Sequence, residues 1–296
     1  MNTTSANRNR FAARIVTADQ PEGLDMYEPY WRLQQAPFGS DCGSRCYFAA
    51  GSHEGALLKL RYLIERGEQC GLLVGDHGLG KTYLSRVLTD GLAAEKYAIA
   101  QVVYPRLTAD ALLGDIAARL GVDPGEEDSA AGRIAIRVEH RLRQMADEEK
   151  RVIVCVDEAH LLDAPHFQTL QLLLNLSEAA GCLVSLVLIG QPQLLTVIRR
   201  VGGLSARVSV RTTLHPFSPE ETAAYVRHRL RLAGRDECPF SEETLSALHE
   251  LSQGVPRQIN HIADLALLIG FADELTALGP VEIEAAAAEL ACVSAD

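Results

Sequence analysis

The chain has 296 residues, of which 47% are hydrophobic and 23% charged, and its formal net charge is −11. This length allows one large domain and a smaller one, and the composition is that of a globular protein. The acidic balance argues against broad adhesion to nucleic acid or anionic lipid, although it leaves room for a local basic patch. No apolar stretch approaches the roughly 20 residues of a transmembrane helix, and residues 1–16 lack the apolar core of a signal peptide. We therefore expect a cytoplasmic protein with no transmembrane segment, whose seven cysteines are thiols.

Residues 1–25 are polar, and we expect them to form a flexible segment. Hydrophobic periodicity and helix-end signals predict helices at residues 53–66, 81–92, 108–120, 130–146, 165–179 and 193–200. Short apolar runs predict strands at 70–74, 97–103, 151–156, 183–189 and 208–214. Strands that alternate with helices indicate a parallel sheet covered on both faces, an αβα sandwich.

After Pro216 the pattern changes to helices alone. Ser218 begins the first of them, and Glu221 completes a capping box. Further helices are predicted at residues 241–251, 257–270 and 281–290. We therefore expect three parts: the flexible segment 1–25, a core domain over 26–216, and a small all-α lid domain over 217–296.

The stretch "GDHGLGKT" follows the first apolar strand and opens a helix. Its glycines and lysine match the P-loop pattern GxxxxGK[ST]. Glycines let backbone N–H groups converge on an anion, and the helix that follows adds its positive amino end. Lys81 is expected to reach the β- and γ-phosphates of ATP, and the Thr82 hydroxyl to ligate Mg²⁺. The expected nucleotide-binding residues here are Gly75, Asp76, His77, Gly78, Leu79, Gly80, Lys81, Thr82 and Tyr83.

The stretch "VIVCVDEAH" ends a buried strand with two acids. Asp157, at the end of a strand expected to lie next to the P-loop strand, is predicted to hold Mg²⁺, and Glu158 to polarise the attacking water. Two acids that merely cap a helix start are the alternative reading.

Three more polar residues follow at strand and helix ends. Gln191, in "VLIGQP", is expected to sense the γ-phosphate, with a simple turn residue as the alternative. Arg207, in "LSARVSVR", is expected to reach a neighbouring subunit's nucleotide, with Arg211 as its competitor and a solvated surface arginine as the alternative. Arg257, in "GVPRQIN", is expected to contact the bound phosphates, with a plain surface cation as the alternative.

With these residues in hand, the chain resembles the AAA+ ATPases, and more narrowly the ExeA/GspA group of bacterial secretion-associated ATPases. The resemblance runs over about residues 26–272, through "MYEPYWRLQQAPF", the P-loop, "VDEAH", "LIGQPQL", "ETAAYVRHRLRLAG" and "GVPRQINHIADLALL". It implies a five-stranded core with a helical lid, ATP hydrolysis at subunit interfaces, and assembly into rings. It also implies that Gln191 is the first sensor, Arg207 the interface finger and Arg257 the second sensor. Longer members continue into a membrane helix and a peptidoglycan-binding domain, and we expect neither within this chain.

Two classes of function remain open at this point. The first is an ATP-hydrolysing assembly or remodelling factor, a homo-oligomer (ring or partial ring) that acts on a protein client of a secretion or cell-envelope system. The second is a DNA-associated regulator, similar to transposition-helper ATPases. For that role the basic stretches 199–211 and 227–235 could contact phosphates.

Overall fold

The structure is a computed structural model that describes residues 26–39, 43–103, 108–122 and 131–293. The expected flexible segment 1–25 lies outside the described residues. Contacts divide the chain into two compact units. Among the described residues, those between 49 and 215 form what we call the sheet unit, and those between 26 and 48 and between 216 and 293 form what we call the helical unit.

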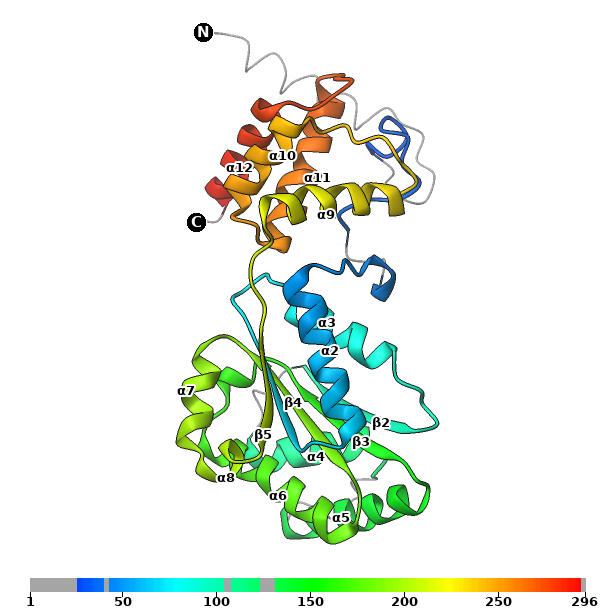
Figure 1. Cartoon of the computed structure of the whole chain (residues 1–296), viewed down its shortest axis with the longest axis vertical. Helices are drawn as coiled ribbons and strands as arrows, with labels where there is room; N and C mark the ends of the chain where they lie inside the picture. Colours follow the sequence, from blue (N-terminus) through cyan, green and yellow to red (C-terminus); the bar gives the residue numbers. More distant parts are fainter. Residues whose placement is uncertain (1–25, 40–42, 104–107, 123–130, 294–296) are drawn as a thin grey trace. The chain divides into compact units, whose positions relative to one another are not determined.

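The sheet unit is built on five parallel strands in the order β2-β3-β4-β1-β5 (Figure 1). The strands are β1 (Cys70–Val74), β2 (Tyr97–Val102), β3 (Arg151–Val156), β4 (Val184–Gly190) and β5 (Val208–Thr213). Every residue of β1 and β4 is buried, as expected for central strands of a sheet with both faces covered. The predicted five-stranded parallel sheet is therefore confirmed.

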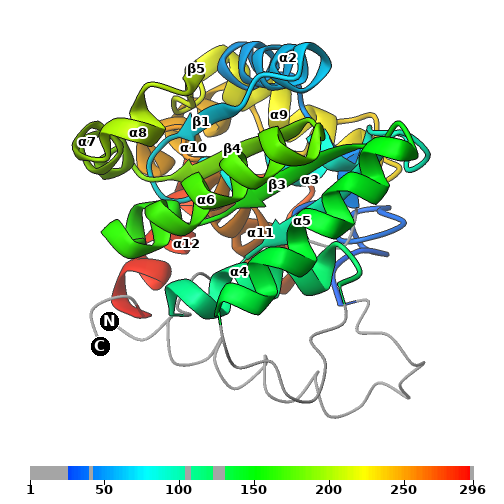
Figure 2. The ribbon, with the colours of Figure 1, turned by 90° about the horizontal axis from the view of Figure 1, so that it is seen from below.

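Helices cover both faces of this sheet (Figure 2). One face carries α2 (Gly51–Arg66) and α3 (Lys81–Asp90), and the other carries α4 (Ala109–Arg119), α5 (Ala131–Asp147) and α6 (Ala164–Ala180). The connection from β4 to β5 contains α7 (Gln193–Arg200) and the short α8 (Gly202–Ser205). Successive strand residues point to opposite faces, so Leu72 packs in the core on the α4–α6 side while Leu73 is buried on the other.

The helical unit contains α9 (Pro219–Leu232), α10 (Glu242–Ser252), α11 (Pro256–Ala272) and α12 (Pro280–Val293), with a 3-10 turn, η1, at Gly43–Cys46 (Figure 1). The predicted capping box at the start of α9 is confirmed, because Ser218 and Glu221 exchange side-chain and backbone hydrogen bonds. Arg257 lies in the first turn of α11.

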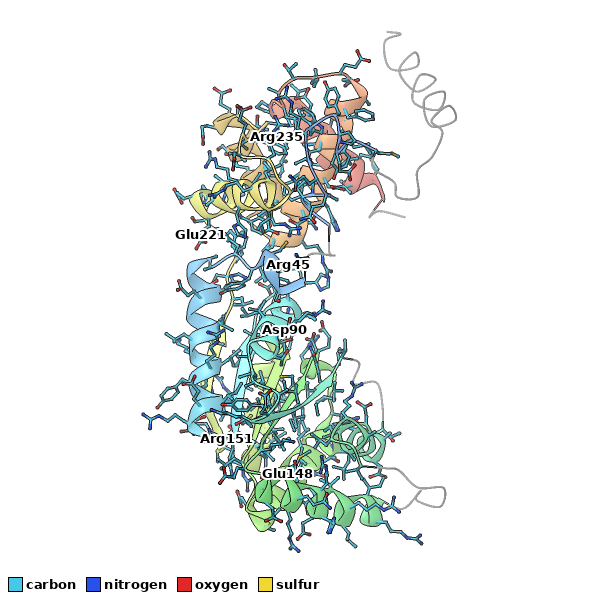
Figure 3. The ribbon with its side chains drawn as sticks, turned by 90° about the vertical axis from the view of Figure 1, so that its right-hand side faces the viewer. Arg45, Asp90, Glu148, Arg151, Glu221 and Arg235 are labelled. Carbon is cyan, nitrogen blue, oxygen red and sulfur yellow. The ribbon has the colours of Figure 1, made fainter. Side chains whose placement is uncertain are left out.

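The chain before Phe48 packs on these helices. Trp31 is 2% exposed, and its indole N–H donates to the carbonyl of Leu267 on α11 at 2.8 Å. Tyr27 donates a hydrogen bond from its hydroxyl to Asp264 on the same helix. Arg235, labelled in Figure 3, lies over the Trp31 ring and donates to the Trp31 carbonyl.

This packing corrects the expected domain division. Residues 26–48 were expected to belong to the core domain that runs to residue 216, whereas their contacts place them in the helical unit. The physical reason is that Tyr27 and Trp31 are buried and bonded to α11, a helix that begins more than 200 residues later.

The cysteines also depart from expectation at one position. Cys70, Cys155, Cys182, Cys238 and Cys292 are free thiols. Cys46 is disulfide-bonded, so the expectation that every cysteine is a thiol is wrong there. Cys42 lies outside the described residues. Among the helices that the structure describes, none is long and apolar enough to cross a membrane.

Candidate nucleotide-binding site

The P-loop joins the end of β1 to the start of α3, in the strand–loop–helix context that the sequence predicted. Gly78 and Gly80 have φ values of 81° and 84°, a left-handed backbone that glycine adopts without strain. Gly80 is also the N-cap of α3 and has no side chain with which to cap the helix. The first N–H groups of α3 are therefore not satisfied by a cap at Gly80, as an anion-binding loop requires.

Lys81 is the first residue of α3 and is only 6% exposed. Its ammonium donates to the carbonyl of Asp76, 2.9 Å away, and so lies across the loop rather than in solvent. A buried ammonium is costly unless it is paired, and such sites favour anionic partners. Asp76 and His77 are exposed at the tip of the loop, and Tyr83 is half-buried on the helix.

Thr82 and Asp157 meet although 75 positions separate them. The Thr82 hydroxyl donates to Oδ2 of Asp157, whose other oxygen accepts the backbone N–H of Glu158 at 2.8 Å. Asp157 is 3% exposed, and Thr82 is exposed. A hydroxyl and a carboxylate oxygen are hard donors of the kind that Mg²⁺ prefers, so these two residues fit the predicted metal site.

Glu158 directly follows Asp157 and has a φ of 50°, an uncommon value for a residue other than glycine. Strained backbone of this kind is concentrated at functional sites. Its carboxylate lies 3.4 Å from Nδ1 of His160, and its side chain is 36% exposed. Glu158 therefore carries a partly exposed carboxylate directly after Asp157 in the chain, and its role as the base that polarises water stays a prediction.

Gln191 follows β4, and the position of β4 in the sheet differs from the expected strand order. Asp157 was expected on a strand next to the P-loop strand, but β4 lies between β3 and β1. Buried apolar runs do not encode which strand lies beside which, because all central strands read alike. The carboxyl ends of β3, β4 and β1 share one edge of the parallel sheet, so Gln191 lies between the two motifs. Its backbone N–H points to Nδ1 of His160 at 3.4 Å.

His160 is the residue of this site that the sequence analysis missed. It lies in the 3-10 turn η2 (Ala159–Leu161), and its ring nitrogen contacts both Glu158 and the backbone of Gln191. The only sequence signal was its place in "VDEAH", three positions after Asp157. Its distance from Asp157 in the sequence does not show that the His160 side chain contacts the backbone at the end of β4.

Arg207 lies at the other edge of the sheet from the P-loop. It precedes β5, and Val208 pairs with Cys70, the first residue of β1, so Arg207 is at the amino edge of the sheet and the P-loop at the carboxyl edge. Its guanidinium donates to Oδ1 of Asn175 at 2.7 Å and lies 3.3 Å from Oε1 of Glu178, both on α6. A hollow of about 290 Å³ at this edge is lined in part by Arg207, and it is separate from the P-loop.

The other two arginines predicted for the site are Arg211 and Arg257. Arg211 lies within β5 and is exposed. Arg257 belongs to the helical unit. Its contact with bound phosphates stays a prediction, as do the sensing role of Gln191 and the interface role of Arg207.

Comparisons with known proteins identify a family match and a relative for this chain. Residues 64–198 match the family model described as "AAA domain". The chain is 35% identical over 249 residues to General secretion pathway protein A of Aeromonas hydrophila, an alignment that covers 83% of this chain. It spans 45% of that protein, less than half of its length.

Solved structures support the same fold. The Aeropyrum pernix ORC2 protein has a TM-score of 0.68 at 14% identity, covering 86% of this chain and 71% of that chain. The Thermotoga maritima RuvB Holliday junction branch migration motor has a TM-score of 0.55 at 15% identity, covering 80% of this chain and 67% of that one. At these identities the likeness shows the fold alone. Residues 64–198 therefore belong to the AAA domain family, and most of the chain is related to General secretion pathway protein A.

Proposed function

We propose that this protein binds ATP with Mg²⁺, hydrolyses the ATP, and works as an oligomeric assembly or remodelling factor. The observation that carries the proposal is the meeting of the Thr82 hydroxyl with the Asp157 carboxylate beside the buried Lys81. Two motifs far apart in the sequence are thereby joined at one edge of the sheet, in the arrangement that phosphoryl transfer from a nucleotide requires.

In this proposal each side chain has one task. Lys81 and the backbone N–H groups of the loop hold the phosphates, and Thr82 and Asp157 hold Mg²⁺. When bound, the metal ion neutralises charge that develops on the phosphate oxygens. Glu158 accepts a proton from the attacking water, which it orients from its exposed position.

Oligomerisation is proposed because Arg207 is on the opposite edge of the sheet from the P-loop. It can complete a site only by leaving Asn175 and Glu178 and entering a neighbouring copy. The relationship to General secretion pathway protein A favours a protein client in a secretion or cell-envelope system.

The arginines of stretch 227–235 have other partners, which weakens the DNA-associated alternative. Arg227 pairs with Glu242, and Arg229 is 6% exposed and donates to backbone carbonyls. Arg235 donates to the carbonyls of Trp31 and Glu237. Arg199 and Arg200 are exposed at the end of α7 and remain accessible to DNA phosphates. The ATPase assay described below is therefore run with and without DNA.

Steady-state ATP hydrolysis and equilibrium ATP binding test the catalytic part of the proposal. Glu158→Gln should lower kcat by about 100-fold or more while ATP stays bound, because only the proton acceptor is lost. Lys81→Ala should abolish ATP binding. Glu65→Gln, which neutralises an exposed carboxylate on α2, is the matched control and should behave as wild type. Unchanged turnover in Glu158→Gln would refute the assigned role.

The oligomeric part is tested by measuring ATPase rate against protein concentration, with and without double-stranded DNA. Specific activity should rise with concentration and fall in Arg207→Ala, but not in the exposed-arginine control Arg200→Ala. Activity that ignores DNA favours a protein client. Strong stimulation by DNA would instead favour the DNA-associated alternative.

A further inference from the structure

A buried histidine outside the predicted motifs contacts the P-loop. His53 is the third residue of α2 and is 6% exposed. Its ring Nε2 lies 2.8 Å from the carbonyl oxygen of Leu79, 26 positions later and directly before Gly80, the N-cap of α3. Both residues belong to the sheet unit.

The chemistry of this contact defines the proton position. A carbonyl oxygen only accepts, so Nε2 of His53 carries a proton and donates it to Leu79. Leu79 itself is 1% exposed, so this carbonyl has little access to water. A buried carbonyl without a donor is costly, so the contact favours one orientation of the peptide that joins Leu79 to Gly80.

That orientation matters for an anion. The peptide is planar and trans, so the N–H of Gly80 points away from the side on which the Leu79 carbonyl meets His53. Phosphates are held by N–H groups that converge in the loop. If this peptide turned over, a carbonyl oxygen would take the place of an N–H group and would repel the phosphates. Gly80, with its φ of 84°, does not resist such a rotation through a side chain.

The other ring nitrogen of His53 contacts Ser52. Its Nδ1 lies 3.2 Å from the hydroxyl oxygen of Ser52, which accepts the backbone N–H of His215 at 3.3 Å. His215 is the last residue of the sheet unit and directly follows Leu214, whose N–H donates to Val74 at the end of β1. The imidazole therefore has a polar neighbour at each ring nitrogen, and the one Ser52 hydroxyl proton has two acceptors, Nδ1 of His53 and the His215 carbonyl oxygen 3.5 Å away.

We propose that His53 is a positioning residue of the nucleotide site, which holds the Leu79–Gly80 peptide with the Gly80 N–H available to phosphate. The inference rests on the proposed nucleotide binding. A histidine that only fills the core would contribute to stability without acting on nucleotide affinity. The two roles therefore differ in what a substitution changes: a positioning residue affects binding of nucleotide more than folding or the chemical step.

The test measures Kd for a non-hydrolysable ATP analogue with Mg²⁺, together with KM, kcat and the thermal midpoint. His53→Ala should raise Kd and KM about 10-fold, the effect of one hydrogen bond of about 1.4 kcal/mol, with kcat within about twofold. His53→Gln keeps an N–H donor at a similar reach and should recover most of the affinity. Ser52→Ala, which leaves the Leu79 contact in place, should raise Kd by a smaller factor.

The control is His249→Ala in the helical unit, since His249 also makes a side-chain hydrogen bond, to Thr222 at 2.9 Å. Its Kd should match wild type. Unchanged Kd in His53→Ala, or equal loss in His53→Gln and His53→Ala, overturns the inference. If His53→Ala does not fold, Ser52→Ala and His53→Gln decide the matter, and an unchanged Kd in Ser52→Ala then counts against it. Failure of wild type to bind the analogue would overturn the proposed function instead.

Discussion

Arg229 on α9 offers a direct test of how the chain before Phe48 is held in the helical unit. Its guanidinium donates to the carbonyls of Pro37 and Gly39 at 2.6 and 2.7 Å and to the Tyr225 hydroxyl at 2.9 Å. The side chain is 6% exposed and Pro37 is buried, so the bond to the Pro37 carbonyl forms away from water, while the bond to the exposed Gly39 is only partly buried. Hydrogen bonds to charged groups contribute about 1.5–3 kcal/mol each, and an abandoned buried carbonyl costs about 1–3 kcal/mol.

Arg229→Ala removes both carbonyl contacts, and we expect it to lower the free energy of unfolding of the helical unit by about 3–5 kcal/mol. For a unit of this size that corresponds to a fall of about 12 °C or more in the thermal midpoint. Arg229→Lys keeps the charge but cannot span both carbonyls, so its loss should be smaller.

The assay is tryptophan fluorescence during urea unfolding, because Trp31 is the only tryptophan of the chain and lies in the segment that Arg229 holds. Exposure of its indole should shift the emission to longer wavelength. Arg231→Ala is the matched control, since Arg231 is exposed and should change stability by no more than about 0.5 kcal/mol. An Arg229→Ala midpoint equal to that of Arg231→Ala, with native Trp31 emission, would refute the reasoning.

Three further outcomes follow from the described contacts. Gly254→Ala should destabilise the helical unit by about 2 kcal/mol or more, measured by the same urea titration, because its φ is 68° and a Cβ would lie 2.2 Å from the Phe217 carbonyl oxygen. Maleimide at neutral pH should label the exposed Cys292 and leave Cys155 of the folded protein unlabelled. The reason is that burial, followed by the charge of Asp157, raises the pKa of the Cys155 thiol to about 12. Rapid labelling of Cys155 in the folded protein would contradict this. Burial, helped by nearby arginines, lowers the pKa of His228, so the folded helical unit binds fewer protons there than the unfolded chain. Its unfolding free energy should therefore fall as pH drops through about 6.5, and His228→Phe should weaken that dependence.

Much of the sheet unit could be predicted from the sequence because its signals are local. The strands at Cys70–Val74 and Arg151–Val156 match their predicted ranges residue for residue, since buried parallel strands are continuous apolar runs with clear ends. The start of α4 was also predicted, because Thr108 caps it through Ala111. The P-loop and the acids after β3 have fixed spacings that a sequence shows directly.

What the sequence did not predict depends on contacts between distant residues. The segment around Trp31 has aromatic residues but no helical or strand period, and its partner Leu267 is 236 positions away. The position of β4 between β3 and β1 likewise depends on how the strands pack together, which no local sequence pattern contains. His53 and His160 are single polar residues whose role depends on which carbonyl or carboxylate the fold brings near, and no local pattern contains that information.

The position of Arg207 leads to a conclusion about how a complete site could form. β1 has five residues between the amino edge, where Arg207 lies, and the P-loop, a span of about 16 Å at 3.3 Å per residue. Arg151, the first residue of β3, marks the same amino edge in Figure 3. An arginine side chain anchored there cannot cross its own buried sheet to reach phosphates at the other edge. If Arg207 acts on a nucleotide, the nucleotide must belong to another copy of the chain. Its bonds to Asn175 and Glu178 on α6 must then be exchanged for that contact, so subunit assembly and arginine release would be one step.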